Sequence, residues 1–146
     1  TWRNALGTIT QDTYIFNASF KDNIRLARPE ASKEDLEQAI NRASLRSVVE
    51  KLPEGMNTIV GSGGQGLSGG ERQRCAVARA LSMDADIILA DEPTANLDRQ
   101  NARAFLGLLE SFKALKKSVI VATHDSIFDE LSATDRVVSL QNGEIV

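Results

Sequence analysis

Two adjacent carboxylic acids, Asp91 and Glu92, directly follow the apolar run "IILA" at residues 87–90. Such a run is typical of a buried parallel strand, and open α/β sheets bind ligands at the carboxyl ends of their strands. Because side chains alternate along a strand, the two acids point in different directions. One can orient Mg²⁺ or its water shell, and the other can polarise an attacking water. A surface Asp–Glu pair is usually just solvated, but a pair that ends an apolar strand is much less common.

A glycine-rich stretch, "GSGGQGLSGG", occupies residues 61–70. Its first six letters fit G-x-G-x-x-G, the pattern of dinucleotide-binding loops. That fingerprint needs a strong strand directly before it and a helix that starts within it. The preceding "TIV" is a poor strand and the helix begins only after Ser68, so the dinucleotide interpretation is disfavoured.

The second half of this stretch predicts a helix that starts at Ser68. Ser68 is a good N-cap, and Glu71 three residues later completes a capping box. Gly69 and Gly70 leave the amides of the first turn bare, so an anion could bind at the helix N-terminus. A well-capped helix without any ligand accounts for the same residues, and both interpretations stay open on these residues alone.

His124 is the only histidine in the chain and follows the apolar run "SVIVA", with Asp125 beside it. A single histidine is more often structural or solvated than catalytic. Its position directly after a predicted strand keeps a functional role open.

Composition narrows the class of protein. The chain has 146 residues, 42% of them hydrophobic, which is enough for one domain with a real core. A net charge of −3 gives no basic surface for nucleic acid. The single cysteine, Cys75, excludes a disulfide framework and a cysteine-cluster metal site. No apolar run reaches the roughly 18 residues that span a bilayer, so the composition predicts a soluble domain of a reducing compartment.

The residues that could do chemistry need elements that position them. A short strand is predicted at residues 5–10, followed by a mostly helical zone from 12 to 83. That zone includes a helix opened by a Ser32–Asp35 capping box and a short helix near residues 46–51. Strands are then expected at 86–90, 118–122 and 136–140, with a helix over about 99–116 and a turn at "QNGE". Alternating strands and helices predict a parallel α/β sheet.

Taken together, "TITQD", "LSGGERQR", "IILADEPTANLD" and "VIVATHD" resemble the ATP-binding cassette (ABC) ATPase domain in their order and spacing. The resemblance covers essentially the whole chain, and "LSGGERQR" before "DEPTANLD" is highly specific. It implies ATP and Mg²⁺ as cofactors. The segment after Gln11, "QDTYIFNASFKDNIRLA", resembles exporter-type cassettes, in which it receives the membrane domain.

The resemblance implies a role for each matching residue. Glu92 resembles the general base, Asp91 the Walker B aspartate that helps to hold Mg²⁺, and His124 the switch histidine at the γ-phosphate. Gln11 resembles the Q-loop glutamine, which senses Mg²⁺ and the attacking water. The resemblance also implies two groups of residues that contact a partner. The first is the signature, which clasps ATP bound to the opposite monomer, at Ser68, Gly69 and Gly70. The second is the D-loop at the dimer interface, at Asn96, Leu97 and Asp98.

The fold implied by the resemblance is α/β, the C-terminal part of a P-loop NTPase (RecA-like) parallel sheet with an inserted α-helical ABC subdomain. Residues 1–12 would end a core strand and form the Q-loop, 13–83 the helical subdomain, and 84–146 the second half of the core. The sheet order would be 5–10, 87–90, 118–122, then the Walker A strand, then 136–140.

No G-x-x-x-x-G-K-[ST] sequence occurs in the 146 residues, so the lysine-bearing phosphate loop is missing from them. The expectation is a cassette cut just before its Q-loop, inactive by itself. The intact domain would hydrolyse ATP in a head-to-tail dimer, bound to a transmembrane partner at the cytoplasmic face of a membrane. Two alternatives are a catalytically silent module that supplies the signature in trans and a soluble, non-transport cassette ATPase.

Overall fold

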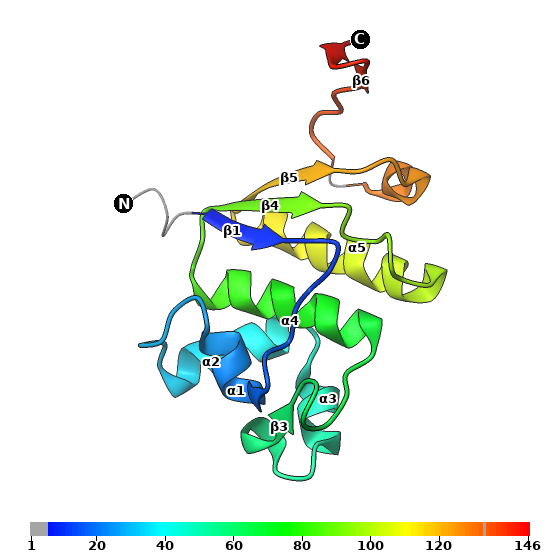
Figure 1. Cartoon of the computed structure of the whole chain (residues 1–146). Helices are drawn as coiled ribbons and strands as arrows, with labels where there is room; N and C mark the ends of the chain where they lie inside the picture. The colour runs from blue at the N-terminus through cyan, green and yellow to red at the C-terminus, as the bar shows by residue number, and fades with distance from the viewer. Residues whose placement is uncertain (1–5, 133) are drawn as a thin grey trace.

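A three-stranded parallel sheet forms one side of the molecule in the computed structural model, which describes residues 6–132 and 134–146 (Figure 1). Its order is β1 (Leu6–Ile9), β4 (Ile87–Asp91) and β5 (Ser118–Ala122). The register pairs Leu6 with Ile87 and Ile87 with Ser118. The α/β class and the predicted order of these three strands are therefore confirmed.

Two helices, α4 (Gly69–Ser82) and α5 (Arg99–Ala114), lie against one face of the sheet (Figure 1). Alternation along the strands turns Ile9, Ile88 and Ala90 toward this face, where they are buried. The opposite face stays open, and Ile120 there is 60% exposed. The sheet packs closely on α4, since a Cβ atom on Gly7 would lie 2.9 Å from the Cβ atom of Ala80.

The helical part lies on the far side of α4 from the sheet (Figure 1). It contains α1 (Phe20–Arg25), α2 (Lys33–Arg42), α3 (Arg46–Lys51) and the 3₁₀ turn η2 (Gly55–Asn57). A small antiparallel pair, β2 (Ala18–Ser19) with β3 (Ile59–Val60), closes it. The helix α4 contacts α1, α2 and β1, so one hydrophobic core runs from the helical part into the sheet.

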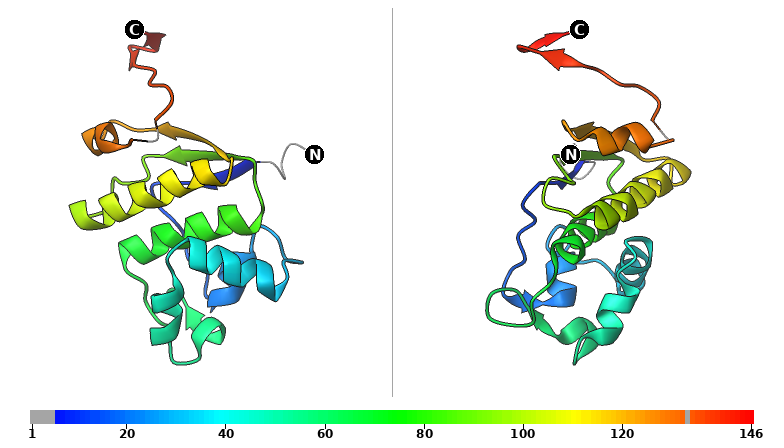
Figure 2. Two further views of the ribbon diagram at one scale, coloured as in Figure 1. Left: turned by 180° about the vertical axis from the view of Figure 1, so that it is seen from behind. Right: turned by 90° about the vertical axis from the view of Figure 1, so that its right-hand side faces the viewer.

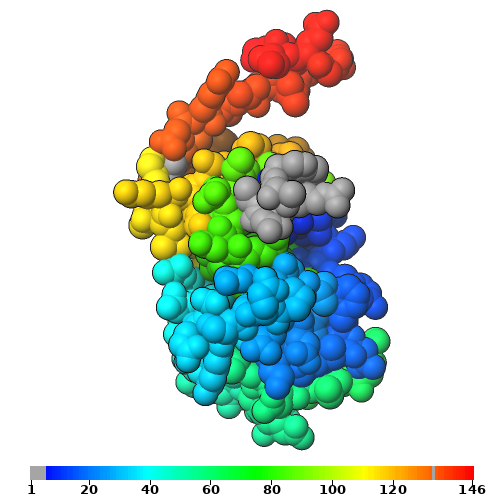
Figure 3. Space-filling model, turned by 90° about the vertical axis from the view of Figure 1, so that its left-hand side faces the viewer, coloured from blue at the N-terminus to red at the C-terminus, as the bar shows by residue number. Residues whose placement is uncertain are grey.

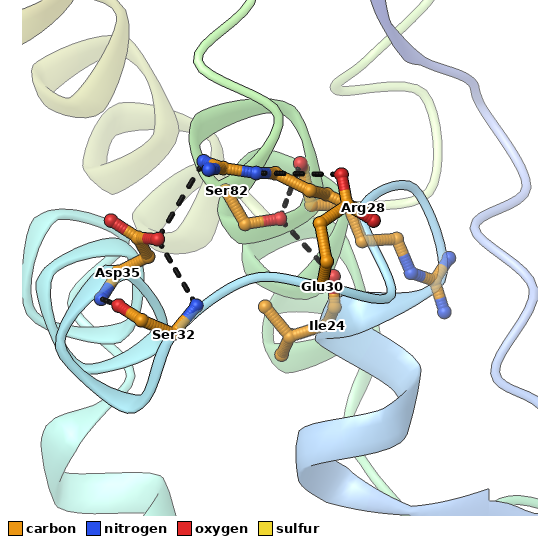
Figure 4. A network of polar contacts seen from close by, with 7 residues as sticks. Ile24, Arg28, Glu30, Ser32, Asp35 and Ser82 are labelled. Atoms are coloured by element: carbon orange, nitrogen blue, oxygen red, sulfur yellow. Dashed lines mark hydrogen bonds and ion pairs between the residues drawn. The ribbon is translucent and has the colours of Figure 1, made fainter.

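Polar contacts hold the α1–α2 connection in place (Figure 4). The Ser32–Asp35 capping box forms as predicted, with the Ser32 hydroxyl accepting from the Asp35 N–H at 3.1 Å. Arg28 reaches Asp35 at 3.6 Å and Glu30 at 3.8 Å. From α4, the hydroxyl of Ser82 donates to a carbonyl of α1, that of Ile24, at 3.2 Å.

The C-terminal segment departs from the expectation. After β5 come a 3₁₀ turn, η3 (Ser126–Glu130), and a hairpin of β6 (Leu140–Gln141) and β7 (Glu144–Ile145). The hairpin turns at Asn142 and Gly143, which both have positive φ, so the "QNGE" turn is confirmed. The turn η3 packs against α5, whereas the hairpin and the residues that lead to it extend away from the body of the molecule (Figures 2 and 3).

The strand predicted at residues 136–140 is wrong, because only Leu140 of that range is in a strand and it pairs with β7. A parallel strand exists only where a neighbour accepts its hydrogen bonds. In the described part of the chain, no strand pairs with the outer edge of β5, so this segment has no ladder to join. Val137 is accordingly 78% exposed.

Candidate active site

Glu92 and His124 meet at the carboxyl ends of β4 and β5. The chain turns at Glu92, which has a φ of 42° and whose N–H donates to the Ala122 carbonyl at 2.9 Å. One carboxylate oxygen, Oε1, contacts His124 Nδ1 at 2.7 Å and accepts from the His124 N–H at 3.2 Å. The other oxygen, Oε2, accepts from the hydroxyl of Thr123 at 3.1 Å. The structure thus brings together two residues that the sequence predicted separately.

Each member of this pair changes the acidity of the other. The hydrogen bond from His124, followed by that from Thr123, lowers the pKa of Glu92 from its ordinary value of 4.5. The same hydrogen bond raises the pKa of His124 above 6.5, since the carboxylate favours the imidazolium form. Glu92 is therefore ionised at neutral pH, as a general base must be.

The turn after β5 is fixed by hydrogen bonds that leave the His124 ring accessible. The Asp125 carboxylate accepts from the hydroxyl of Thr94, which is buried, at 2.7 Å and from the Ile127 N–H at 3.0 Å. The side chain of His124 remains 87% exposed, whereas that of Glu92 is 24% exposed. The imidazole can therefore reach a ligand while Nδ1 stays on Glu92.

Asp91 ends β4 on the open face of the sheet. Alternation places it with Ile87 and Leu89, away from the helices. Neither its carboxylate nor the side-chain amide of Gln11 has a hydrogen bond or ion pair with another described residue. No cluster of three or more His, Cys, Asp or Glu residues that could hold a metal occurs in residues 6–132 and 134–146. Mg²⁺ is usually held by one or two carboxylates together with substrate phosphates, so Asp91 has the type of side chain that such a site uses.

A pocket of about 140 Å³ brings Gln11 beside Gly69 and Asn96. The Asn96 amide donates to the Gln11 carbonyl at 3.4 Å. Glu92 and His124 do not line this pocket. The predicted site residues therefore fall into two groups, one at the ends of β4 and β5 and one between residues 10–13 and the start of α4.

The predicted start of α4 is confirmed in detail. The Ser68 hydroxyl accepts from the Glu71 N–H at 3.3 Å, and the Glu71 carboxylate accepts from the Ser68 N–H at 2.7 Å. Gly70 has a packing role that the sequence did not reveal, because a Cβ atom there would lie 2.5 Å from Oδ1 of Asn101. At Gly69 the nearest atom to such a Cβ is 3.4 Å away, so this glycine is less crowded.

The side chain of Asp98 caps the N-terminus of α5. Its carboxylate accepts from the backbone N–H of Asn101 at 2.9 Å and from the Asn101 amide at 2.7 Å. These hydrogen bonds lower the pKa of Asp98. Its expected place at a dimer interface remains a prediction.

Sequence reasoning missed Gln73, whose side chain contacts residues 10–13 from α4. The sequence did contain an indication, because Gln73 is a polar residue on the otherwise apolar, buried stripe of α4 that includes Gly70, Ala76 and Val77. It also missed Thr123, because a hydroxyl between Ala122 and His124 carries no pattern of its own.

No helix among the described residues has the length and apolar character needed to cross a bilayer. The fold is similar to that of a solved bacterial Atm1-family ABC exporter with ATP bound, with a TM-score of 0.80 and 32% identity. That similarity covers 98% of this chain and 24% of the exporter chain.

Two curated relatives share the sequence pattern. A probable ABC transporter ATP-binding/permease protein of Haemophilus influenzae is 40% identical over 143 residues, which are 98% of this chain and 25% of that protein. The mitochondrial iron-sulfur clusters transporter ATM1 of Candida glabrata is 36% identical over 144 residues, 98% of this chain and 20% of that protein. The chain thus spans a quarter or less of the length of these relatives.

The family model described as "ABC transporter" matches residues 1–95, which is more than half of the chain. The matched range includes all of α4 and the strand β4 that ends at Asp91. The protein therefore belongs to the ABC transporter family.

Proposed function

We propose that the chain forms part of an ATPase domain that couples ATP hydrolysis to transport across a membrane. The observation that carries the proposal is the 2.7 Å contact between Glu92 and His124 at the carboxyl end of a parallel sheet. Such strand ends are where open α/β sheets bind ligands. A carboxylate that is oriented at both oxygens and ionised at neutral pH is suited to accept the proton of an attacking water.

The roles proposed for the other residues follow from their surroundings. His124 keeps Nδ1 on Glu92 and offers its exposed ring to the terminal phosphate. Asp91 and Gln11 would hold Mg²⁺, which when bound neutralises charge on the phosphates. In this scheme the 13–83 segment is the helical subdomain, and 84–146 together with 1–12 belongs to the core.

The exposed N-terminus of α4 supports a role in trans. Ser68 is exposed and Gly69 is half-buried, whereas Gly70 is buried against the side chain of Asn101. A helix N-terminus favours anions. We propose that these residues contact the γ-phosphate of ATP held by a second nucleotide-binding domain in a head-to-tail dimer.

An exposed apolar surface next to Gln11 supports a transmembrane partner. Tyr14 is 65% exposed, Phe16 42% and Leu26 51%, and the Tyr14 and Phe16 rings pack edge to face at 4.8 Å. All three line a depression of about 370 Å³. We propose that a transmembrane domain docks here, which would place the chain at the cytoplasmic face of a membrane.

A hybrid transporter tests the proposal. Residues 1–146 replace the matching segment of the Haemophilus influenzae relative, so that a complete domain surrounds the candidate site. Glu92→Gln should then lower steady-state phosphate release by about 10²- to 10⁴-fold, the usual contribution of a general base. ATP binding should persist, and ATP-bound dimers should accumulate in size-exclusion chromatography with ATP and Mg²⁺.

Glu50→Gln is the matched control, because Glu50 is an exposed glutamate on α3. It should leave turnover unchanged. The 146-residue chain alone should release no more phosphate than its own Glu92→Gln variant. A hybrid whose Glu92→Gln variant turns over like the parent would rule out Glu92 as the base.

A further inference from the structure

Residues 11–15 form a connection with little backbone support. They link β1 to the helical part, and none of their backbone groups bonds to another backbone group of the described residues. Gln11 and Asp12 are exposed, and Thr13 is half-buried. Side chains from elsewhere in the fold must therefore determine where this segment lies.

Gln73 supplies one of these contacts from α4. Its amide is buried, with the residue 3% exposed, and both ends of the amide are used. The oxygen Oε1 accepts from the Thr13 hydroxyl at 3.0 Å, and Nε2 donates to the Thr10 carbonyl at 3.4 Å. A buried amide left without partners costs free energy, so these two contacts favour one position of the segment on α4.

Asn96 supplies the other contact, from the loop that follows Glu92. Its Nδ2 atom donates to a carboxylate oxygen of Asp12 at 2.9 Å and to the Gln11 carbonyl at 3.4 Å. Two amide side chains, on α4 and on the loop after β4, thus hold residues 10–13 from two different elements. The pocket that contains Gln11 lies between them.

We propose that Gln73 is a positioning residue that fixes Gln11 relative to the start of α4. Gln73 lies one helical turn after Gly69, so a displacement of the N-terminal end of α4 moves Thr13 and with it Gln11. Through Asn96 the same displacement reaches the loop after Glu92. The inference rests on the proposed function, because Gln73 would link two parts that this function uses, namely Gln11 and the start of α4.

The test compares Gln73→Met, Thr13→Val and the double variant in the hybrid transporter. Gln73→Met keeps the side-chain length and removes both polar ends. Each single variant should lower kcat for ATP about tenfold with little change in KM, since misplacement of a positioned group by about 1 Å can cost up to about a hundredfold. Because both variants remove the same contact, the double variant should lose no more than the worse single variant.

Hydrogen exchange gives a readout that does not depend on turnover. The amides of residues 11–15 have no acceptor among the described residues, so the readout is the Phe16 N–H, which follows the segment directly and donates to Oδ1 of Asn23 at 2.8 Å. This amide should exchange at least about tenfold faster in Gln73→Met and in Thr13→Val than in the parent. Gln38→Met is the matched control, because Gln38 is an exposed glutamine on α2. It should change neither kcat nor exchange.

The outcomes separate the inference from the proposed function. Parent-like kcat or parent-like exchange in Gln73→Met overturns the inference, as does a double variant whose loss is the product of the single losses. If Gln73→Met fails to fold, Thr13→Val decides alone, because it changes only a half-buried loop residue. A parent hybrid without ATP turnover contradicts the proposed function, and the exchange measurement then decides the inference by itself.

Discussion

The Nδ1 atom of His124 lies 2.7 Å from Oε1 of Glu92, although 32 positions separate the two residues in the chain. The register of the sheet explains the contact. Asp91 pairs with Ala122, so the residues that follow these two strands leave the sheet side by side. Thr123 holds the second carboxylate oxygen, which means that the end of β5 orients the whole carboxylate group.

The first prediction concerns the acidity of His124. Its pKa should lie above 6.5, because the Glu92 carboxylate accepts a hydrogen bond from the ring. Glu92→Gln should return the pKa toward 6.5, and an NMR titration measures this directly because the chain has one histidine. Asp125→Asn is the control, since Asp125 raises the pKa of His124 only through its charge. A larger fall in Asp125→Asn than in Glu92→Gln would contradict the geometry.

The second prediction concerns the pH dependence of stability. The pKa of His124 is raised, so its contribution is complete below 6.5 and is lost as pH rises through the raised pKa. The pKa of Glu92 is lowered, so its contribution is complete above 4.5 and is lost as pH falls through the lowered pKa. The stability difference between the parent chain and His124→Gln should therefore be largest between pH 4.5 and 6.5.

Urea unfolding at about pH 5.5 and about pH 9 measures that difference, since the pair is fully charged only at the lower value. Equal differences at both pH values would show that the contact does not depend on charge.

The third prediction contrasts two helical glycines. Gly70→Ala should lower the free energy of unfolding by about 1–3 kcal/mol, as overpacking usually does. The new Cβ atom would lie 2.5 Å from Oδ1 of Asn101, and Asn101 is held by its contact with Asp98 at 2.7 Å. Gly107→Ala should instead raise the free energy by about 0.5–1 kcal/mol, because alanine is the better helix former.

Gly107 is the matched control because it lies inside α5 and a Cβ atom there would meet no atom within 4 Å. Urea unfolding of both variants decides the point. Changes of the same sign at Gly70 and Gly107 would mean that the close approach of α4 and α5 does not persist in solution.

The fourth prediction concerns the outer edge of β5. The Ser118 N–H donates to the Asp86 carbonyl, and the Ala122 carbonyl accepts from the Glu92 N–H, both at 2.9 Å. Because alternate residues of a strand bond to opposite sides, the N–H groups of Val119 and Val121 point toward the free edge. In a dilute monomer these two amides should exchange quickly, and association should rise with concentration because the edge is apolar. Strong protection of both amides in a dilute monomer would refute this prediction.

Local features of the fold followed from the sequence by itself. The capping boxes at Ser32 and Ser68 and the turn at Asn142–Gly143 each depend on residues at most three positions apart, so their patterns suffice. The apolar runs also placed β4 and β5, although such runs are typical of strands buried on both faces and only one face of these strands packs against helices. The order and spacing of the motifs were enough to indicate the ABC family.

The tertiary structure decided which distant groups meet. The Glu92–His124 contact depends on β5 lying next to β4, and the Thr13–Gln73 contact joins positions 60 residues apart. The same dependence on neighbours made the strand predicted at 136–140 wrong, because hydrophobic residues form a strand only when another strand accepts their hydrogen bonds. Gly70 is a further example. Its sequence pattern suggested only a bare amide for an anion, but in the structure Asn101 of another helix comes so close that position 70 has no room for a side chain. Local patterns report what a segment favours, whereas contacts between segments depend on how the whole chain packs.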